Sequence, residues 1–180
     1  MNAKDIIREQ ISASAEIKQQ LLSDNRVCDV IAKAAQICVE AYRNGKKTLF
    51  AGNGGSAADA QHLAGEFVSK FYFDRPGLPS IALTTDTSIL TAIGNDYGYD
   101  RLFARQVQAQ GNEGDVFIGI STSGNSKNLV EALPECHRKG IYTIALTGSK
   151  PCKMDDFDLV IKVPSDSPPR IQECQTLIGH

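Results

Sequence analysis

The sequence TLFAGNGGSAADAQHLAGE (residues 48–66) joins an apolar run to a glycine-rich turn and then to a helical pattern. A strand, a tight turn and a helix in this order form the unit from which α/β folds are built. Small residues in the turn let the backbone wrap around an oxyanion, and the N-terminus of the following helix attracts negative charge. This stretch therefore predicts an anion site where the strand meets the helix.

Further along the chain, short apolar runs recur between stretches with helical character. They do not alternate polar with apolar residues, so both faces of the predicted sheet should be covered. The sequence predicts an α/β fold, a three-layer sandwich with a five-stranded parallel sheet. The predicted strands lie in the runs TLFAG (48–52), SIALT (80–84), DVFIGIS (115–121), YTIALTG (142–148) and DLVIKVP (158–164).

Two amphipathic helices precede the first strand. Two helices bury little by themselves, so we expect them to pack on the sheet and on a partner subunit, which predicts an oligomer. We expect one domain, residues 1–180, in which residues 1–45 form the helical pair and residues 46–180 form the sheet and the ligand site. The second helix has a broad apolar stripe over residues 27–41 and stops at Gly45, and the first carries Ile7, Ile11, Ile17 and Leu21.

Composition narrows the class of protein. The 180 residues, 42% hydrophobic and 22% charged, suit one soluble core. The sequence lacks a run of about 20 apolar residues for a membrane span and a secretory signal, so we expect a cytoplasmic protein with no membrane partner. A net charge of −2 gives no reason to expect nucleic acid. The five cysteines form no C-x-x-C pair, which predicts reduced thiols.

A second loop, STSGNS (residues 121–126), follows the third predicted strand and carries four hydroxyl groups. A polar turn that caps a helix would look similar, but two such loops at the carboxyl ends of parallel strands favour phosphate binding. The first loop also fits G-x-G-x-x-A, a variant of the dinucleotide fingerprint. A nicotinamide cofactor is not favoured, because that motif needs an acidic residue about 20 positions later and Asp86 lies too far along the chain.

Three further features could carry chemistry. His62 and Glu66 are one helical turn apart, which is the spacing of paired metal ligands or of a base and its orienting group, although an exposed helix pair has the same spacing. Gln172 and His180 are two turns apart on one face of the last helix, which could equally be an ordinary amphipathic helix. Asp96 lies in a glycine-flanked connection between helical segments, where a turn aspartate and a site residue are about equally expected.

Together these residues resemble the sugar isomerase (SIS) domain family, whose fold is flavodoxin-like. The resemblance covers essentially the whole chain and rests on AGNGGSAADAQHLAGE, AIGNDYGYD, GDVFIGISTSGNS and RIQE. Within the family, the chain is most similar to enzymes that convert sedoheptulose 7-phosphate to D-glycero-D-manno-heptose 7-phosphate for lipopolysaccharide or capsule synthesis. The resemblance thus implies an aldose-ketose isomerase that works through an enediol intermediate, and a homotetramer with sites between subunits.

The resemblance also implies roles for individual residues. It implies that Glu66 and His180 form the acid/base pair and that Asp96 is a further active-site residue. We prefer Glu66 as the base and His180 as the proton donor; the alternative is that His180 removes the proton while Glu66 binds the metal. The resemblance implies one zinc ion per subunit, with the ligands His62, Glu66, Gln172 and His180. The implied substrate contacts are Asn53, Gly54, Ser56, Asp96, Ser121, Thr122, Ser123, Ser126 and Gln172.

Two alternatives stay open at this point. Some relatives with this fold bind the bacterial replication initiator instead of isomerising sugars, and others isomerise a different phosphosugar. The non-catalytic relatives lack the glutamate and the final histidine that stand here as Glu66 and His180, which favours an enzyme. One residue departs from the family pattern, since Gln175 stands where relatives often have a histidine.

Overall fold

The computed structural model describes residues 2–180 and contains the five-stranded parallel sheet that the sequence predicts. The strand order is β2-β1-β3-β4-β5. The chain reverses its direction of winding between β1 and β3, and open α/β sheets bind their ligands at such a point. The strands are β1 (Thr48–Gly52), β2 (Ser80–Ala82), β3 (Val116–Ile120), β4 (Tyr142–Thr147) and β5 (Leu159–Lys162).

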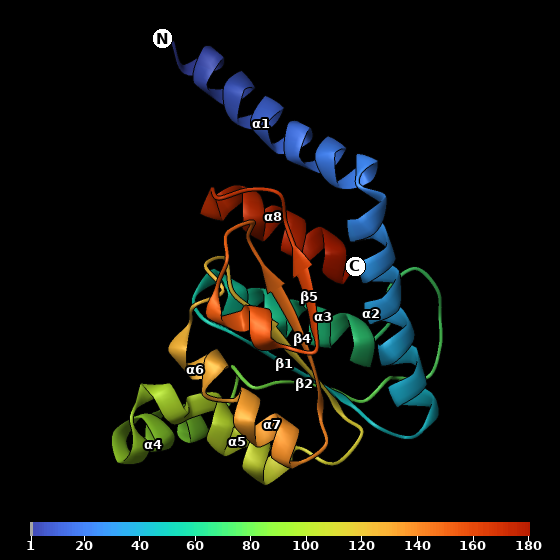
Figure 1. Ribbon diagram of the computed structural model, residues 1–180, viewed down its shortest axis with the longest axis vertical. Helices are drawn as coiled ribbons and strands as arrows, with labels where there is room; N and C mark the ends of the chain where they lie inside the picture. Colours follow the sequence, from blue (N-terminus) through green and yellow to red (C-terminus); the bar gives the residue numbers. More distant parts are fainter. Residues whose placement is uncertain (1) are drawn as a thin grey trace.

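Helices cover both faces of the sheet, which gives the predicted three layers (Figure 1). One face carries α2 (Asn25–Arg43), α3 (Gly55–Val68) and α8 (Pro168–Gly179). The other face carries α5 (Leu102–Gln110), α6 (Lys127–Val130), α7 (Leu133–Arg138) and the short 3₁₀ helix η2 (Lys153–Asp156). Beside them lie α4 (Thr87–Tyr97) and the 3₁₀ helix η1 (Tyr99–Arg101).

The central strands consist mostly of apolar residues, and both of their faces are buried. In β1, Leu49 and Ala51 belong to the core under α5, whereas Phe50 belongs to the core under α2 and α3. In β3, Phe117 and Ile118 divide in the same way. This explains why the predicted strands read as continuous apolar runs rather than as alternating ones.

The two N-terminal helices differ in how they pack. Asp24 separates α1 (Ala3–Ser23) from α2, and its carboxylate accepts hydrogen bonds from the first backbone N–H groups of α2. Whereas α2 packs on the sheet, α1 extends away from the body and touches α8 with one side (Figure 1). Four large apolar side chains of α1 are exposed, Ile6 by 48%, Ile7 by 57%, Ile11 by 65% and Leu22 by 70%. α2 therefore packs on the sheet itself, whereas α1 packs on α8 through Ile17 and Leu21 near its C-terminal end.

None of the helices within residues 2–180 combines the length and the apolar character that a membrane span needs.

Candidate active site

The first ligand loop is the glycine-rich turn between β1 and α3. Gly54 has a φ of +57°, a conformation that glycine adopts without strain, and it immediately precedes the first residue of α3. A side chain on Gly52 would meet the backbone oxygen of Ser56 at 2.5 Å, so the turn can close only with glycine there. No side chain caps α3, so the positive end of its dipole is open to a ligand.

The second ligand loop, residues 121–126, follows β3 and is ordered by its own hydroxyl groups. The Ser121 hydroxyl accepts a hydrogen bond from the backbone N–H of Gly124 at 3.2 Å and lies 2.9 Å from the Ser126 hydroxyl. Ser121 is only 4% exposed, whereas Thr122, Ser123 and Ser126 remain open to solvent to different degrees. Hydroxyl groups that converge on one small loop suit a phosphate group.

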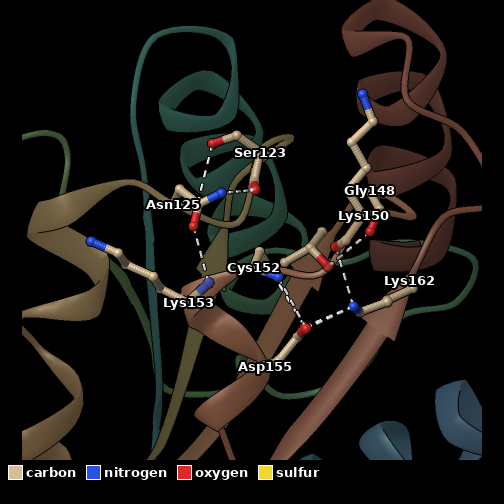
Figure 2. Close-up of polar contacts among 9 residues, drawn as sticks. Ser123, Asn125, Gly148, Lys150, Cys152, Lys153, Asp155 and Lys162 are labelled. Atoms are coloured by element: carbon tan, nitrogen blue, oxygen red, sulfur yellow. Dashed lines mark hydrogen bonds and ion pairs between the residues drawn. The ribbon is translucent and has the colours of Figure 1, made fainter.

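The second loop is held in shape by the side chain of its own Asn125 and by backbone groups at the start of η2 (Figure 2). The Asn125 side chain donates to the Ser123 carbonyl at 2.9 Å and accepts from the backbone N–H of Lys153 at 3.0 Å. The next backbone N–H, that of Met154, donates to the Gly124 carbonyl at 3.0 Å. Gly124 has a φ of +62°, and a side chain on it would collide with the sulfur of Cys152. The loop is therefore held in shape before any ligand binds.

An ion pair fixes the position of Cys152 (Figure 2). Asp155 accepts hydrogen bonds from the backbone N–H of Cys152 at 3.0 Å and from its thiol at 3.2 Å, and Lys162 lies 2.8 Å from the same carboxylate. The Lys162 ammonium holds the pKa of Asp155 below its usual value. Burial, followed by the nearby Asp155 carboxylate, raises the pKa of the Cys152 thiol. This thiol therefore supports the loop as a protonated packing group.

A pair of amides, one half-buried and one buried, joins the first ligand loop to the helix that follows the second. Asn53 and Asn128 exchange two hydrogen bonds, at 2.9 and 2.8 Å, and the Tyr99 hydroxyl donates to the Asn53 amide oxygen at 2.8 Å. Sequence analysis singled out Asn53 but not Asn128 or Tyr99. Tyr99 lay within the quoted stretch AIGNDYGYD, whereas the sequence alone gave no sign that Asn128 would lie beside residue 53.

His62, Glu66 and His180 lie close together at the far ends of α3 and α8. The Nε2 atoms of His62 and His180 are 2.8 Å apart, and the Glu66 carboxylate lies 3.8 Å from His62 Nε2. Phe71 stacks on the His180 ring with centroids 4.8 Å apart. The predicted spacing of His62 and Glu66 thus corresponds to a real cluster, in which all three polar groups are partly or largely exposed.

Gln172 does not join this cluster, because α3 and α8 run side by side in the same direction. The Gln172 side chain lies at Gly55, in the first turn of α3, and Thr176 donates to Asp59 at 2.9 Å one turn later. Eight helical residues separate Gln172 from His180, a rise of about 12 Å. The structure therefore brings together three of the four implied zinc ligands and leaves the fourth at the other end of the helix pair.

The three clustered side chains have donor types that zinc accepts, but their arrangement is that of a hydrogen-bonded pair. Two nitrogens on a tetrahedral zinc ion, each at 2.0–2.1 Å, would be about 3.3 Å apart, which is more than the 2.8 Å between His62 and His180. Among residues 2–180, no group of three histidine, cysteine, aspartate or glutamate side chains is arranged to hold a metal ion. The imidazole rings of His62 and His180 would have to move slightly apart before both could bind a zinc ion.

The structure separates the candidate acid/base residues from the phosphate loop within one chain. The glycine-rich turn lies at the start of α3 and Glu66 lies eleven residues after Gly55, a rise of about 16 Å along the helix. Within a single subunit, Glu66 therefore lies too far along α3 to reach a ligand held at this turn. Asp96 lies in the last turn of α4, not in a connection between helices, and is exposed.

Comparison with known proteins places this geometry in a family. The SIS domain model matches residues 11–148. A phosphoheptose isomerase of Aneurinibacillus thermoaerophilus is 60% identical over 177 residues, which cover 98% of this chain and 89% of that protein. Phosphoheptose isomerase 2 of Campylobacter jejuni is 61% identical over 180 residues and covers 99% of this chain and 90% of that protein. The chain belongs to the phosphoheptose isomerases of the SIS domain family.

A solved phosphoheptose isomerase has the same fold over the whole chain. The structure of the enzyme from Francisella tularensis superimposes with a TM-score of 0.94 at 39% identity, and the match covers 100% of this chain and 95% of that one. The family assignment confirms the predicted SIS fold and the aldose-ketose isomerase class. The roles of individual site residues stay predictions.

Proposed function

We propose that this protein converts sedoheptulose 7-phosphate to D-glycero-D-manno-heptose 7-phosphate. The family assignment gives the reaction class, and one observation in the structure carries the proposal for this chain. Glu66 and His180 lie in one cluster with His62 between them, in a chain that also has a preformed phosphate loop. The two alternatives, a sugar-phosphate-binding protein without activity and an isomerase for another phosphosugar, are less favoured by this combination and by the names of the relatives.

The phosphate group of the substrate binds the second loop in this proposal. Ser121, Thr122, Ser123 and Ser126 supply hydroxyl groups, and Asn53, Gly54 and Ser56 approach from the first loop. Asp96 and Gln172 contact the sugar. Because the phosphate is remote from the reacting carbons, its binding energy serves to orient the sugar. Loss of one hydroxyl group should therefore mainly raise KM.

Glu66 and His180 carry out the proton transfers. Glu66 removes a proton from C1 of the ketose while the C2 carbonyl oxygen gains a proton from His180, which gives the enediol. The O1 hydroxyl then returns a proton to His180 as the C1 carbonyl forms, and Glu66 delivers its proton to C2. Each group ends in the state in which it began, as an isomerase requires.

Such a site needs residues of two subunits. The rise of about 16 Å along α3 between the glycine-rich turn and Glu66 exceeds the length of an extended seven-carbon sugar phosphate. We therefore place Glu66 and His180 of one subunit beside the phosphate loop of a neighbour in a homotetramer. The exposed apolar residues of α1 support this, since Ile6, Ile7 and Ile11 would be covered by a second subunit.

Zinc is part of the proposal as one ion per subunit. His62, Glu66 and His180 would hold it, because two imidazole nitrogens and a carboxylate are common zinc ligands, and Gln172 would not. A carboxylate on the metal loses basicity, so Glu66 and His180 would transfer protons only after the ion leaves or gives up these ligands. When bound, the ion would polarise the sugar carbonyl and stabilise the oxyanion that develops on it. The donor set fits the metal once the two imidazoles separate. We further propose that the protein acts in the cytoplasm and supplies heptose for lipopolysaccharide or capsule.

The decisive experiment is turnover of sedoheptulose 7-phosphate by purified protein, with a Glu66→Gln variant as the control and with zinc either added or chelated. Turnover that is lost in the variant supports the proposal. Calorimetric binding of the substrate without turnover under any of these conditions would favour the non-catalytic alternative. Turnover of a different phosphosugar alone would favour the other isomerase.

A further inference from the structure

We infer that Asn128 is a positioning residue of the sugar-phosphate site, which fixes the Asn53 amide so that it meets the substrate as a hydrogen-bond donor. This inference deepens the proposed function and rests on it for the identity of the ligand. Asn128 itself does not touch the substrate, because it is 2% exposed and lies behind Asn53.

The two amides lie beyond the carboxyl ends of two neighbouring strands, β1 and β3. Asn53 follows β1 and Asn128 lies in α6, directly after the loop that follows β3, and β1 pairs with β3 along its full length. The reciprocal hydrogen bonds of 2.9 and 2.8 Å therefore link the glycine-rich loop to the phosphate loop at the point where the sheet reverses its winding. The Asn128 backbone lies in α6 and the Asn53 backbone follows directly on β1, so what the pair of hydrogen bonds adds is the orientation of the Asn53 side chain.

The hydrogen bonds leave Asn53 with one unused group. An amide oxygen accepts two hydrogen bonds and an amide nitrogen donates two. The Asn53 oxygen already accepts from Asn128 and from the Tyr99 hydroxyl. The Asn53 nitrogen donates one N–H to Asn128. The remaining group is one N–H, so Asn53 can only donate to the ligand, and its partner must be a phosphate or sugar oxygen.

Tyr99 gives the arrangement a second consequence. Its hydroxyl donates to Asn53, so its oxygen retains lone pairs that can accept from a sugar hydroxyl. Gly98, with a φ of +82°, directs the chain from α4 into η1 and so brings Tyr99 over the first loop. Asn53 and Tyr99 together present a donor beside an acceptor, which matches the alternating oxygen and hydroxyl groups of a polyol phosphate.

A role in packing alone would not need an amide at this position. A buried asparagine costs free energy unless both ends of its side chain are paired, and an apolar side chain would fill the space at lower risk. The Asn128 amide can both donate to Asn53 and accept from it. This pairing selects one of the two orientations that the Asn53 amide group could adopt. A variant that preserves the volume but not the pairing should therefore fold normally but bind the sugar phosphate weakly.

The test compares Asn128→Ala and Asn128→Asp with the wild type by calorimetric binding of sedoheptulose 7-phosphate and by steady-state kinetics. For Asn128→Ala we expect Kd and KM to rise about tenfold, the effect of one lost hydrogen bond, with kcat changed by less than about twofold. An unchanged Kd in a folded Asn128→Ala variant overturns the inference. The binding measurement decides this whether or not the wild type turns the sugar over, so failure of the proposed function is a separate result.

The pH dependence of Asn128→Asp gives a readout that a packing role would not move. A protonated aspartic acid can donate to the Asn53 oxygen and accept from its nitrogen, as the native amide does, whereas the ionised form faces that oxygen with a second acceptor. Burial and this contact raise the pKa of the new carboxyl. We expect the ratio of variant to wild-type Kd to approach one as the pH falls through that pKa, and to stay constant for Asn128→Ala. A ratio that is independent of pH in both variants contradicts the inference.

Discussion

The Nε2 atoms of His62 and His180 lie within hydrogen-bond distance of each other, which ties the last turn of α8 to the middle of α3. Glu66 lies one helical turn beyond His62 on the same face, whereas Gln172 lies at the opposite end of the helix pair. This relationship separates the three residues of the proposed zinc site from the larger set that the family resemblance implies.

Zinc binding should distinguish the two sets. Because Gln172 lies about two helical turns from His180, we expect Gln172→Ala to bind zinc like the wild type, whereas His62→Ala should lose at least about tenfold in affinity. Zinc content after equilibrium dialysis measures both. Equal losses in the two variants would show that Gln172 reaches the metal after all.

Subunit mixing tests whether sites form between chains. Glu66→Gln lacks the proposed base, and Gly124→Ala distorts the proposed phosphate loop because its new side chain meets Cys152. Each variant alone should be nearly inactive, while randomly mixed tetramers should regain activity at about a quarter of their sites, since such a site draws on two different subunits. Circular dichroism should first show that Gly124→Ala is folded. If mixing restores nothing, each site lies within a single chain.

Loss of the Asn125 side chain, which holds the phosphate loop in shape, should weaken substrate binding but leave the chemical step unchanged. Asn125→Ala removes the bonds to the Ser123 carbonyl and to the backbone of Lys153, so the phosphate loop loses its fixed shape. We expect KM to rise about tenfold with kcat nearly unchanged. Lys153→Ala is the matched control, because it keeps the backbone N–H that Asn125 uses. A lower kcat at unchanged KM would contradict this role.

The cysteines should differ sharply in reactivity. Burial raises the pKa of Cys38 to about 11 and that of Cys136 to about 12, while Cys28 is exposed. A raised pKa keeps a thiol protonated below that value, so at pH 8 the two buried thiols should react slowly with a chromogenic disulfide until the protein unfolds. Cys28 should account for the fast phase, and Cys28→Ser should abolish it. A fast phase that survives this change would point to another accessible thiol.

Replacing the buried Gln175 by an apolar residue should cost little or no stability. Gln175 is fully buried, and its nitrogen donates to the Leu146 carbonyl at 2.8 Å, but its own amide oxygen has no partner among the described residues. Leu146 keeps its bond from the Ser121 backbone. Gln175→Met loses one hydrogen bond and removes one unpaired oxygen, so we expect a free energy of unfolding within about 1 kcal/mol of the wild type or above it. Urea unfolding measures it, and Gln175→Glu should be clearly less stable.

The sequence predicted the sheet well because its evidence is local. Each strand is an apolar run, and the loops after β1 and β3 carry glycine and hydroxyl residues in continuous stretches. The approach of Asn128 to Asn53 depends instead on the pairing of β1 with β3, which brings together residues that are far apart in the chain. No local pattern at residue 128 reports that contact.

The turn-forming residues around Asp96 led to a wrong prediction of local structure. The segment around Asp96 has several asparagine, aspartate and glycine residues and was expected to connect helices, but it forms the end of α4. The helix is stabilised at its start, where the Asp86 carboxylate accepts from the backbone of Ile89 at 2.9 Å, and by Leu90 and Ile93, which pack against the core. A good N-cap and an apolar face outweighed the turn-forming residues at the other end.

The direction of α3 has a consequence for the assembled enzyme. The helix begins at one ligand loop and ends among the acid/base residues, which in the proposed tetramer serve a different substrate molecule. Every subunit then contributes to two catalytic centres, and a rigid rod of backbone joins them. In that arrangement, damage to a single subunit would impair two catalytic centres at once.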